Sequence, residues 1–122
     1  MNNKRYAHLT ETLLSSTKKV ADSKRHSYTG GSDDVLANFK RIAERLNVDP
    51  FVILGVYLNK QVDAVNTYIK DGTLSEPFEG RIVDCLNYIF LAHAMYVENE
   101  EASGKNVITS TEELENYAEN QD

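Results

Sequence analysis

Apolar residues recur at steps of three and four along four stretches of the chain, which is the spacing of amphipathic helices. The pattern predicts helices over about residues 5–24, 34–46, 50–70 and 75–98. The apolar stripe is most regular in the third helix, where it comprises Leu54, Leu58, Val62, Val65 and Ile69. The first helix has a thin apolar face, so we expect it to pack on the others. The sequence therefore predicts an all-α, four-helix bundle-like domain in which neighbouring helices are antiparallel.

Residues that cap and end helices separate these stretches. Asp49 and Pro50 are typical of a helix start, and Gly72 is typical of a helix end. We expect Ser75 to cap the last long helix, with Pro77 early in its first turn. The paired glycines in residues 25–34 predict a loop after the first helix.

Composition and charge divide the chain into two parts. Its 122 residues include no Trp, two Pro and six Gly, which favours helices over a sheet. The net charge is −6, yet residues 97–122 alone carry −7. We therefore expect a helical domain at 1–101 and an acidic tail at 102–122, with a short helix over about 110–118. The near-neutral domain argues against duplex nucleic acid as a partner.

No apolar run approaches the roughly 20 residues that span a bilayer, and the N-terminus has no signal-peptide pattern. We expect a protein without a membrane partner, located in the cytoplasm, or in the host cell's cytoplasm if a phage encodes it. The single cysteine, Cys85, cannot form an internal disulfide and is interpreted as a packed thiol.

A line of polar residues follows one side of the otherwise apolar last helix. It comprises Arg81, Asp84, Asn87 and Tyr88. Buried polar groups require partners, which either the protein or a ligand must provide. The structural alternative is that Arg81 and Asp84 simply pair with each other and fix the register of the bundle.

Several separated blocks give the chain a resemblance to a known family. Residues 24–97 resemble small phage and bacterial proteins of the nucleotide modification associated domain 1 family, which are distantly similar to MazG-type nucleotide pyrophosphohydrolases. The matching blocks are Lys24, Tyr28, Gly30 and Gly31, then Leu36-Ala37-Asn38-Phe39, Leu58-Asn59-Lys60, Glu76 with Glu79, and Asp84 with Asn87-Tyr88.

The resemblance implies a helical bundle that handles nucleotides and assembles as an oligomer. It implies that the ligand-facing positions are Tyr28, Asn38, Lys60, Asp63, Arg81, Asp84 and Asn87. A tyrosine can stack on a base, the two cations can meet phosphates, and the amides and Asp84 can bind hydroxyls or base edges. The ligand site could lie between subunits, where Tyr28 of one chain would meet Arg81 of another.

Two functions follow from these residues. The first is a phage-type protein that sequesters a nucleotide-derived host immune signal, such as a cyclic ADP-ribose species or a cyclic nucleotide, without catalysis or a cofactor. The alternative is a Mg²⁺-dependent nucleoside triphosphate pyrophosphohydrolase, with Glu76, Glu79, Asp84 and Asp63 as candidate metal ligands. A complete cluster of acids on two helices is not visible, and Arg81 lies among these acids, so we favour the first function.

Overall fold

The computed structural model describes residues 1–120, with the side chains of residues 26–28 left out of the description. The described residues form five helices and no strand, which confirms the predicted all-α class. The helices are α1 (Asn3–Thr29), α2 (Ala37–Leu46), α3 (Pro50–Asp71), α4 (Phe78–Ala102) and α5 (Thr111–Glu119). None of them is both long enough and apolar enough to cross a bilayer.

The first helix is longer than the sequence predicts. It continues through residues 25–29, which we expected to be loop, and ends where Gly30 takes a left-handed conformation with φ 63°. Thr29 lies in the last turn, where its hydroxyl donates to the carbonyl of Arg25 at 2.9 Å. The backbone turns only where glycine permits a positive φ, so the loop is correspondingly shorter.

The ends of α2 and α3 follow local side-chain chemistry. Asp34 does not begin α2 as expected; its Oδ1 accepts from the amide of Leu36 at 2.9 Å in the preceding turn. Asp49 caps α3 as predicted, accepting from the amide of Phe51 at 2.8 Å. Gly72 ends α3 with φ 74°, again as predicted.

The expected start of α4 at Ser75 is wrong. The helix begins after Pro77, which has the extended backbone angles φ −57° and ψ 133° and forms no side-chain cap. A residue that precedes proline is disfavoured in the helical region, so Glu76 interrupts any helix started at Ser75. The other end of α4 extends four residues beyond the expected Glu98, to Ala102.

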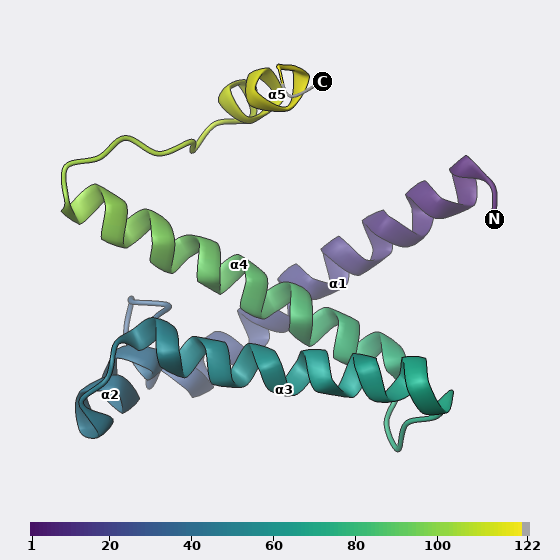
Figure 1. The fold of residues 1–122 in the computed structure, drawn as a ribbon, viewed down its shortest axis with the longest axis horizontal. Helices are drawn as coiled ribbons and strands as arrows, with labels where there is room; N and C mark the ends of the chain where they lie inside the picture. The colour runs from purple at the N-terminus through teal and green to yellow at the C-terminus, as the bar shows by residue number, and fades with distance from the viewer. Residues whose placement is uncertain (121–122) are drawn as a thin grey trace.

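The packed core is small and lies where α2 meets α3 and α4. Its buried members are Leu36, Phe39, Ala43, Ile53, Leu54 and Met95. The helices α3 and α4 form a hairpin, and α1 crosses behind α4 (Figure 1). At that crossing Thr17 is fully buried, and its hydroxyl donates to the carbonyl of Leu13 at 2.7 Å. The N-terminal half of α1 projects past the crossing and is mostly exposed.

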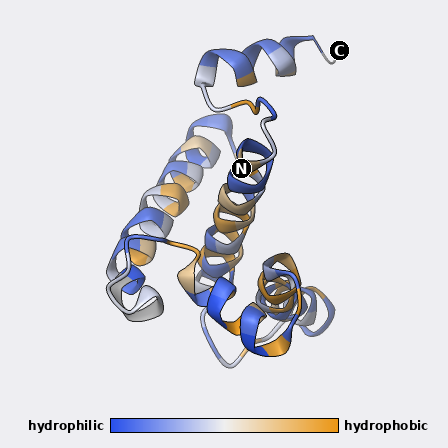
Figure 2. Cartoon of the chain, turned by 90° about the vertical axis from the view of Figure 1, so that its left-hand side faces the viewer, coloured by the Kyte–Doolittle hydropathy of each residue, from blue (hydrophilic) through white to orange (hydrophobic). Residues whose placement is uncertain are grey.

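The short acidic helix predicted near residue 110 is present as α5. Ser110 accepts from the amide of Glu113 at 3.1 Å, and its hydroxyl donates to the carboxylate of the same residue at 3.0 Å. The first of these bonds caps the N-terminus of α5, and the second holds the Glu113 carboxylate beside the same hydroxyl. Within the described part of the chain, α5 packs against no other helix, and Figure 2 shows it as a mostly hydrophilic segment standing apart.

Candidate functional site

A cavity of about 430 Å³ lies between the second half of α1, the start of α2 and the middle of the α3–α4 hairpin. Small-molecule sites commonly measure 300–1,000 Å³. Its lining combines aromatic, amide and charged side chains, namely Lys24, Arg25, Asn38, Phe39, Tyr57, Lys60, Gln61, Asp84, Asn87, Tyr88 and Phe90. Four helices therefore bring to one place residues that are far apart in the sequence.

Aromatic rings form the part of the cavity nearest the core. Tyr57 on α3 and Tyr88 on α4 lie parallel, with ring centroids 6.0 Å apart and planes inclined by 10°. Phe39 on α2 meets both rings edge-on, at 5.9 Å and 6.4 Å. Phe39 is buried while the two tyrosines are half-buried, so their surfaces remain partly accessible. Such a ring cluster offers flat apolar surface of the kind that nucleobases stack on.

The polar part of the site lies one to two helical turns from the tyrosines, toward the C-terminus of α3 and the N-terminus of α4. There Arg81 donates to Gln61 Oε1 at 3.0 Å and pairs with Asp84 at 3.2 Å and Glu76 at 2.8 Å. Lys24 Nζ on α1 lies 3.9 Å from Asp84. This group of side chains joins α1, α3 and α4. Arg81 thus supports the lining residues Gln61 and Asp84 from behind.

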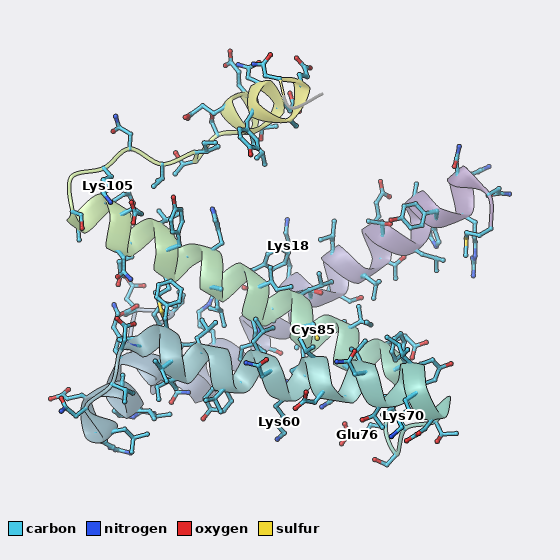
Figure 3. The ribbon with its side chains drawn as sticks, viewed as in Figure 1. Lys18, Lys60, Lys70, Glu76, Cys85 and Lys105 are labelled. Atoms are coloured by element: carbon cyan, nitrogen blue, oxygen red, sulfur yellow. The ribbon has the colours of Figure 1, made fainter. Side chains whose placement is uncertain are left out.

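Cations outnumber anions in the lining. The basic members are Lys24, Arg25 and Lys60, and the one acidic member is Asp84, which pairs with both Arg81 and Lys24. Arg25 pairs with Asp22 at 2.7 Å, at an exposed position. Lys60 extends outward from the middle of α3 (Figure 3) and makes no ion pair with any described residue. An anion entering the cavity would therefore meet uncompensated positive charge.

The structure brings together four of the seven expected ligand-facing residues. Asn38, Lys60, Asp84 and Asn87 line the cavity. Arg81 stands behind it, in contact with two lining residues. Asp63 is exposed and does not line it. The expectation for Tyr28 concerns a side chain outside the described ones.

Sequence reasoning missed five lining residues that bear on recognition, namely Lys24, Arg25, Phe39, Tyr57 and Gln61. Lys24 was expected to end the first helix and Arg25 to begin the loop after it, and neither was expected to face a ligand. Phe39 and Tyr57 belong to ordinary apolar helix positions, and Gln61 follows Lys60 without any distinguishing spacing. One signal was available for Lys24 and Phe39, because each belongs to one of the matching blocks.

The acids proposed as magnesium ligands do not form a metal site in this arrangement. The guanidinium of Arg81 lies between Glu76 and Asp84 and pairs with both. Glu79 and Asp84 line a second hollow between α1 and α4, which Arg81 and Lys24 also line. Among the described residues, no three His, Cys, Asp or Glu side chains are grouped so as to hold a metal ion. The residues present therefore do not fit a two-helix magnesium cluster.

Cys85 sits on α4 between Asp84 and Leu86 and is half-buried. Burial raises the pKa of its thiol above the ordinary value, with the Asp84 charge acting in the same direction. A raised pKa reduces the fraction of reactive thiolate at neutral pH. This environment agrees with the interpretation of a packed thiol rather than a nucleophile.

Comparison of the chain with protein-family models, with curated proteins and with solved structures gives no match.

Proposed function

We propose that this chain binds a nucleotide-derived anion in the cavity between α1, α2 and the α3–α4 hairpin, and holds it without chemical change. The observation that carries the proposal is the order of the lining along the hairpin. Lys60, Gln61 and Asp84 lie about one helical turn from the rings of Tyr57 and Tyr88, on the side away from the core. A base against the rings would have its phosphates near the cations.

The direction of α3 and α4 supports this orientation. The facing pairs Tyr57 with Tyr88 and Gln61 with Arg81 show that the two helices run antiparallel. Lys60 and Asp84 therefore belong to the same level of the hairpin, on the side of the tyrosines away from the core. Lys24 reaches this level from α1. Positive charge from two helices converges beside the aromatic part of the cavity.

The amide side chains add specificity to this charge. Asn38 and Asn87 line the cavity, and each can donate and accept hydrogen bonds at once. Asn38 Oδ1 accepts from Arg41 at 2.7 Å, which leaves the Asn38 amide group to donate. Such groups distinguish base edges and ribose hydroxyls. The resemblance to the nucleotide modification associated domain 1 family leads us to expect the same ligand class, including immune signals of the cyclic ADP-ribose and cyclic nucleotide types.

The absence of chemical change is proposed from the state of the acids. A pyrophosphohydrolase requires carboxylates that are available to magnesium and a polarised water. Glu76 and Asp84 instead share the cation of Arg81. Their charge contributes to positioning Arg81 and, through it, Gln61.

The test is a thermal-shift panel of ATP, ADP-ribose, cyclic ADP-ribose and 3′,5′-cyclic AMP, each with and without Mg²⁺. Every stabilising compound is then recovered and identified by chromatography. A ligand that binds only the folded state raises stability by about 2.7 kcal/mol at one hundred times its Kd. We expect at least one compound to stabilise the protein and to be recovered intact.

Two outcomes would contradict the proposal. One is that no compound in the panel, at millimolar concentration, changes the melting temperature. The other is Mg²⁺-dependent conversion of ATP to a monophosphate that Asp84→Asn abolishes, which would establish the pyrophosphohydrolase alternative.

A further inference from the structure

We infer that the side of the α3–α4 hairpin facing away from α1 and α2 is the contact surface for a second copy of this chain. The surface, called the outer face below, comprises Leu58, Val62, Val65 and Ile69 on α3 and Ile82, Leu86, Ile89, His93 and Tyr96 on α4. In Figure 1, α1 crosses behind α4, and no other helix covers the side of α4 turned to the viewer.

The helical spacing places these two rows on one side of the hairpin. On α4 the inward row is Arg81, Asp84, Tyr88, Leu91 and Met95. At 100° per residue, the outer row of α4 lies about 140° round the helix from it. On both helices the outer row begins one residue after an inward one, as Ile82 follows Arg81 and Leu58 follows Tyr57. Because α3 and α4 are antiparallel, a rotation in the same sense leads to the same side of the pair.

The outer face is apolar although it is open to solvent. Ile69 is 73% exposed, Ile89 50%, Tyr96 49% and Val62 39%. Residues 85–97 contain no Asp, Glu, Lys or Arg at all. A solvated helix carries charged residues on its exposed side, whereas the centre of a protein interface is depleted of them. The composition of this surface is therefore that of an interface.

The total surface of the chain exceeds that of a compact monomer of the same mass. The chain exposes 9129 Å², whereas a compact monomer of 13.8 kDa would expose about 6,600 Å². The unpacked α5 and the projecting half of α1 supply part of the excess of about 2,500 Å². A stable dimer of standard size requires only about 800 Å² from each partner.

A second copy is the occupant that the surface favours. A symmetric dimer places the same patch on both partners, which requires a patch that can face itself without charge repulsion. The outer face meets that condition because its nine residues include no carboxylate, lysine or arginine. An acidic or basic partner would find no complementary charge there.

The experiment measures the molar mass of the full-length protein by sedimentation equilibrium. We expect twice the 13.8 kDa chain mass for the unmodified protein. Ile89→Glu places a carboxylate in the middle of the outer face and should weaken the dimer at least tenfold. Ile69→Glu, on the other helix of the same face, is the second variant and should act in the same direction. Circular dichroism checks that both variants stay helical.

Matched controls place the same carboxylate elsewhere. Val56→Glu lies on α3 at a position 63% exposed and outside the outer face, and should leave the dimer unchanged. Leu114→Glu alters α5, where Leu114 is 57% exposed, and should also leave it unchanged. A monomeric unmodified protein at 100 µM would overturn the inference. So would a dimer that survives both outer-face variants, or one that only Leu114→Glu dissociates.

Discussion

The two sides of the α3–α4 hairpin differ in composition, and beside the cavity the usual arrangement of polar and apolar residues is reversed. The side turned toward α1 holds half-buried charged and amide groups, including Arg81, Asp84 and Asn87. The side turned to solvent holds isoleucine, leucine and tyrosine. In a monomer without ligands the opposite placement is expected, because burial favours apolar groups and water favours charges. This difference is the basis of both proposals, a nucleotide-derived ligand on the inner side and a second copy of the chain on the outer side.

The largest expected change in the free energy of unfolding comes from a substitution in the hydrophobic core, which lies on the inner side. Leu54 is 2% exposed and is one of six residues in the buried cluster. Leu54→Ala should lower the free energy of unfolding by about 2–5 kcal/mol, because it removes packed methyl groups and leaves a cavity. Urea denaturation at fixed protein concentration measures the change. Val56→Ala, at an exposed position on the same helix, should cost under about 0.5 kcal/mol; an equal loss in both variants would contradict the core assignment.

The next effect concerns the charged group on the inner side. Arg81→Met should destabilise the protein by about 1–3 kcal/mol, because Asp84 and Gln61 lose a donor in a half-buried environment. Lys105→Met is the matched control: it breaks the pair with Glu100 on a lysine whose side chain is 67% exposed, and should cost less than about 0.5 kcal/mol. Thermal unfolding of the two variants compares them. If Arg81→Met proved neutral, the inner side would not depend on this cation.

The ends of the helices show which features of the fold could be predicted from the sequence. The helix starts at Asp49 and Ser110 and the end at Gly72 were predictable, because each depends on a side chain or glycine within a few residues. The start at Phe78 was mistaken because Ser75 has the right chemistry for a cap, yet Pro77 determines where helical angles begin. Local rules therefore settle the helices wherever a single residue dominates.

Prediction of the cavity required information that local sequence patterns do not contain. The polar line on α4 was visible in the sequence, and the resemblance added Asn38 and Lys60 to the expected ligand-facing residues. Tyr57 and Lys24 were not identified, because only the packing of α1 and α3 on α4 shows which of their faces meets that line. An aromatic residue at helical spacing has the same pattern whether it packs in a core or lines a cavity.

A smaller effect distinguishes the helical body from the tail. Ser110→Ala removes the side-chain cap of α5 and should cost that helix about 1 kcal/mol. Because α5 packs against none of the other described helices, the melting temperature of the body should not change. Hydrogen exchange should show faster exchange confined to residues 111–119. A lowered melting temperature would indicate that α5 packs on the body.

The smallest effect is a pH dependence of stability at the ion pairs of Lys40, which connect α2 to α4. Lys40 bonds Asp34 at 2.6 Å and Glu98 at 2.8 Å. The hydrogen bond from Lys40 holds the pKa of Asp34 below its ordinary value of 3.8, and the same bond raises the pKa of Lys40 above 10.5. The Asp34 contribution to stability is thus present above pH 3.8 and lost as pH falls through the lowered pKa.

At alkaline pH the contribution to stability changes with pH in the opposite direction. The Lys40 contribution is present below pH 10.5 and lost as pH rises through the raised pKa. Both groups are more than one third exposed, so the change should stay under about 1 kcal/mol. Denaturation of Lys40→Met as a function of pH should give a flatter profile at both extremes. A profile identical to that of the unmodified protein would show that the ion pairs of Lys40 contribute nothing to stability.

The most direct test of the inner side as a ligand site compares two lysines on the same helix. Lys60 lines the cavity, whereas Lys70 lies near the end of α3, outside it (Figure 3). With the most stabilising compound of the nucleotide panel, calorimetric titration should give a Kd at least about tenfold weaker for Lys60→Ala, the loss of one phosphate contact. Lys70→Ala should bind within about twofold of the unmodified protein. Equal affinity in all three proteins would contradict the assignment of the cavity as the nucleotide site.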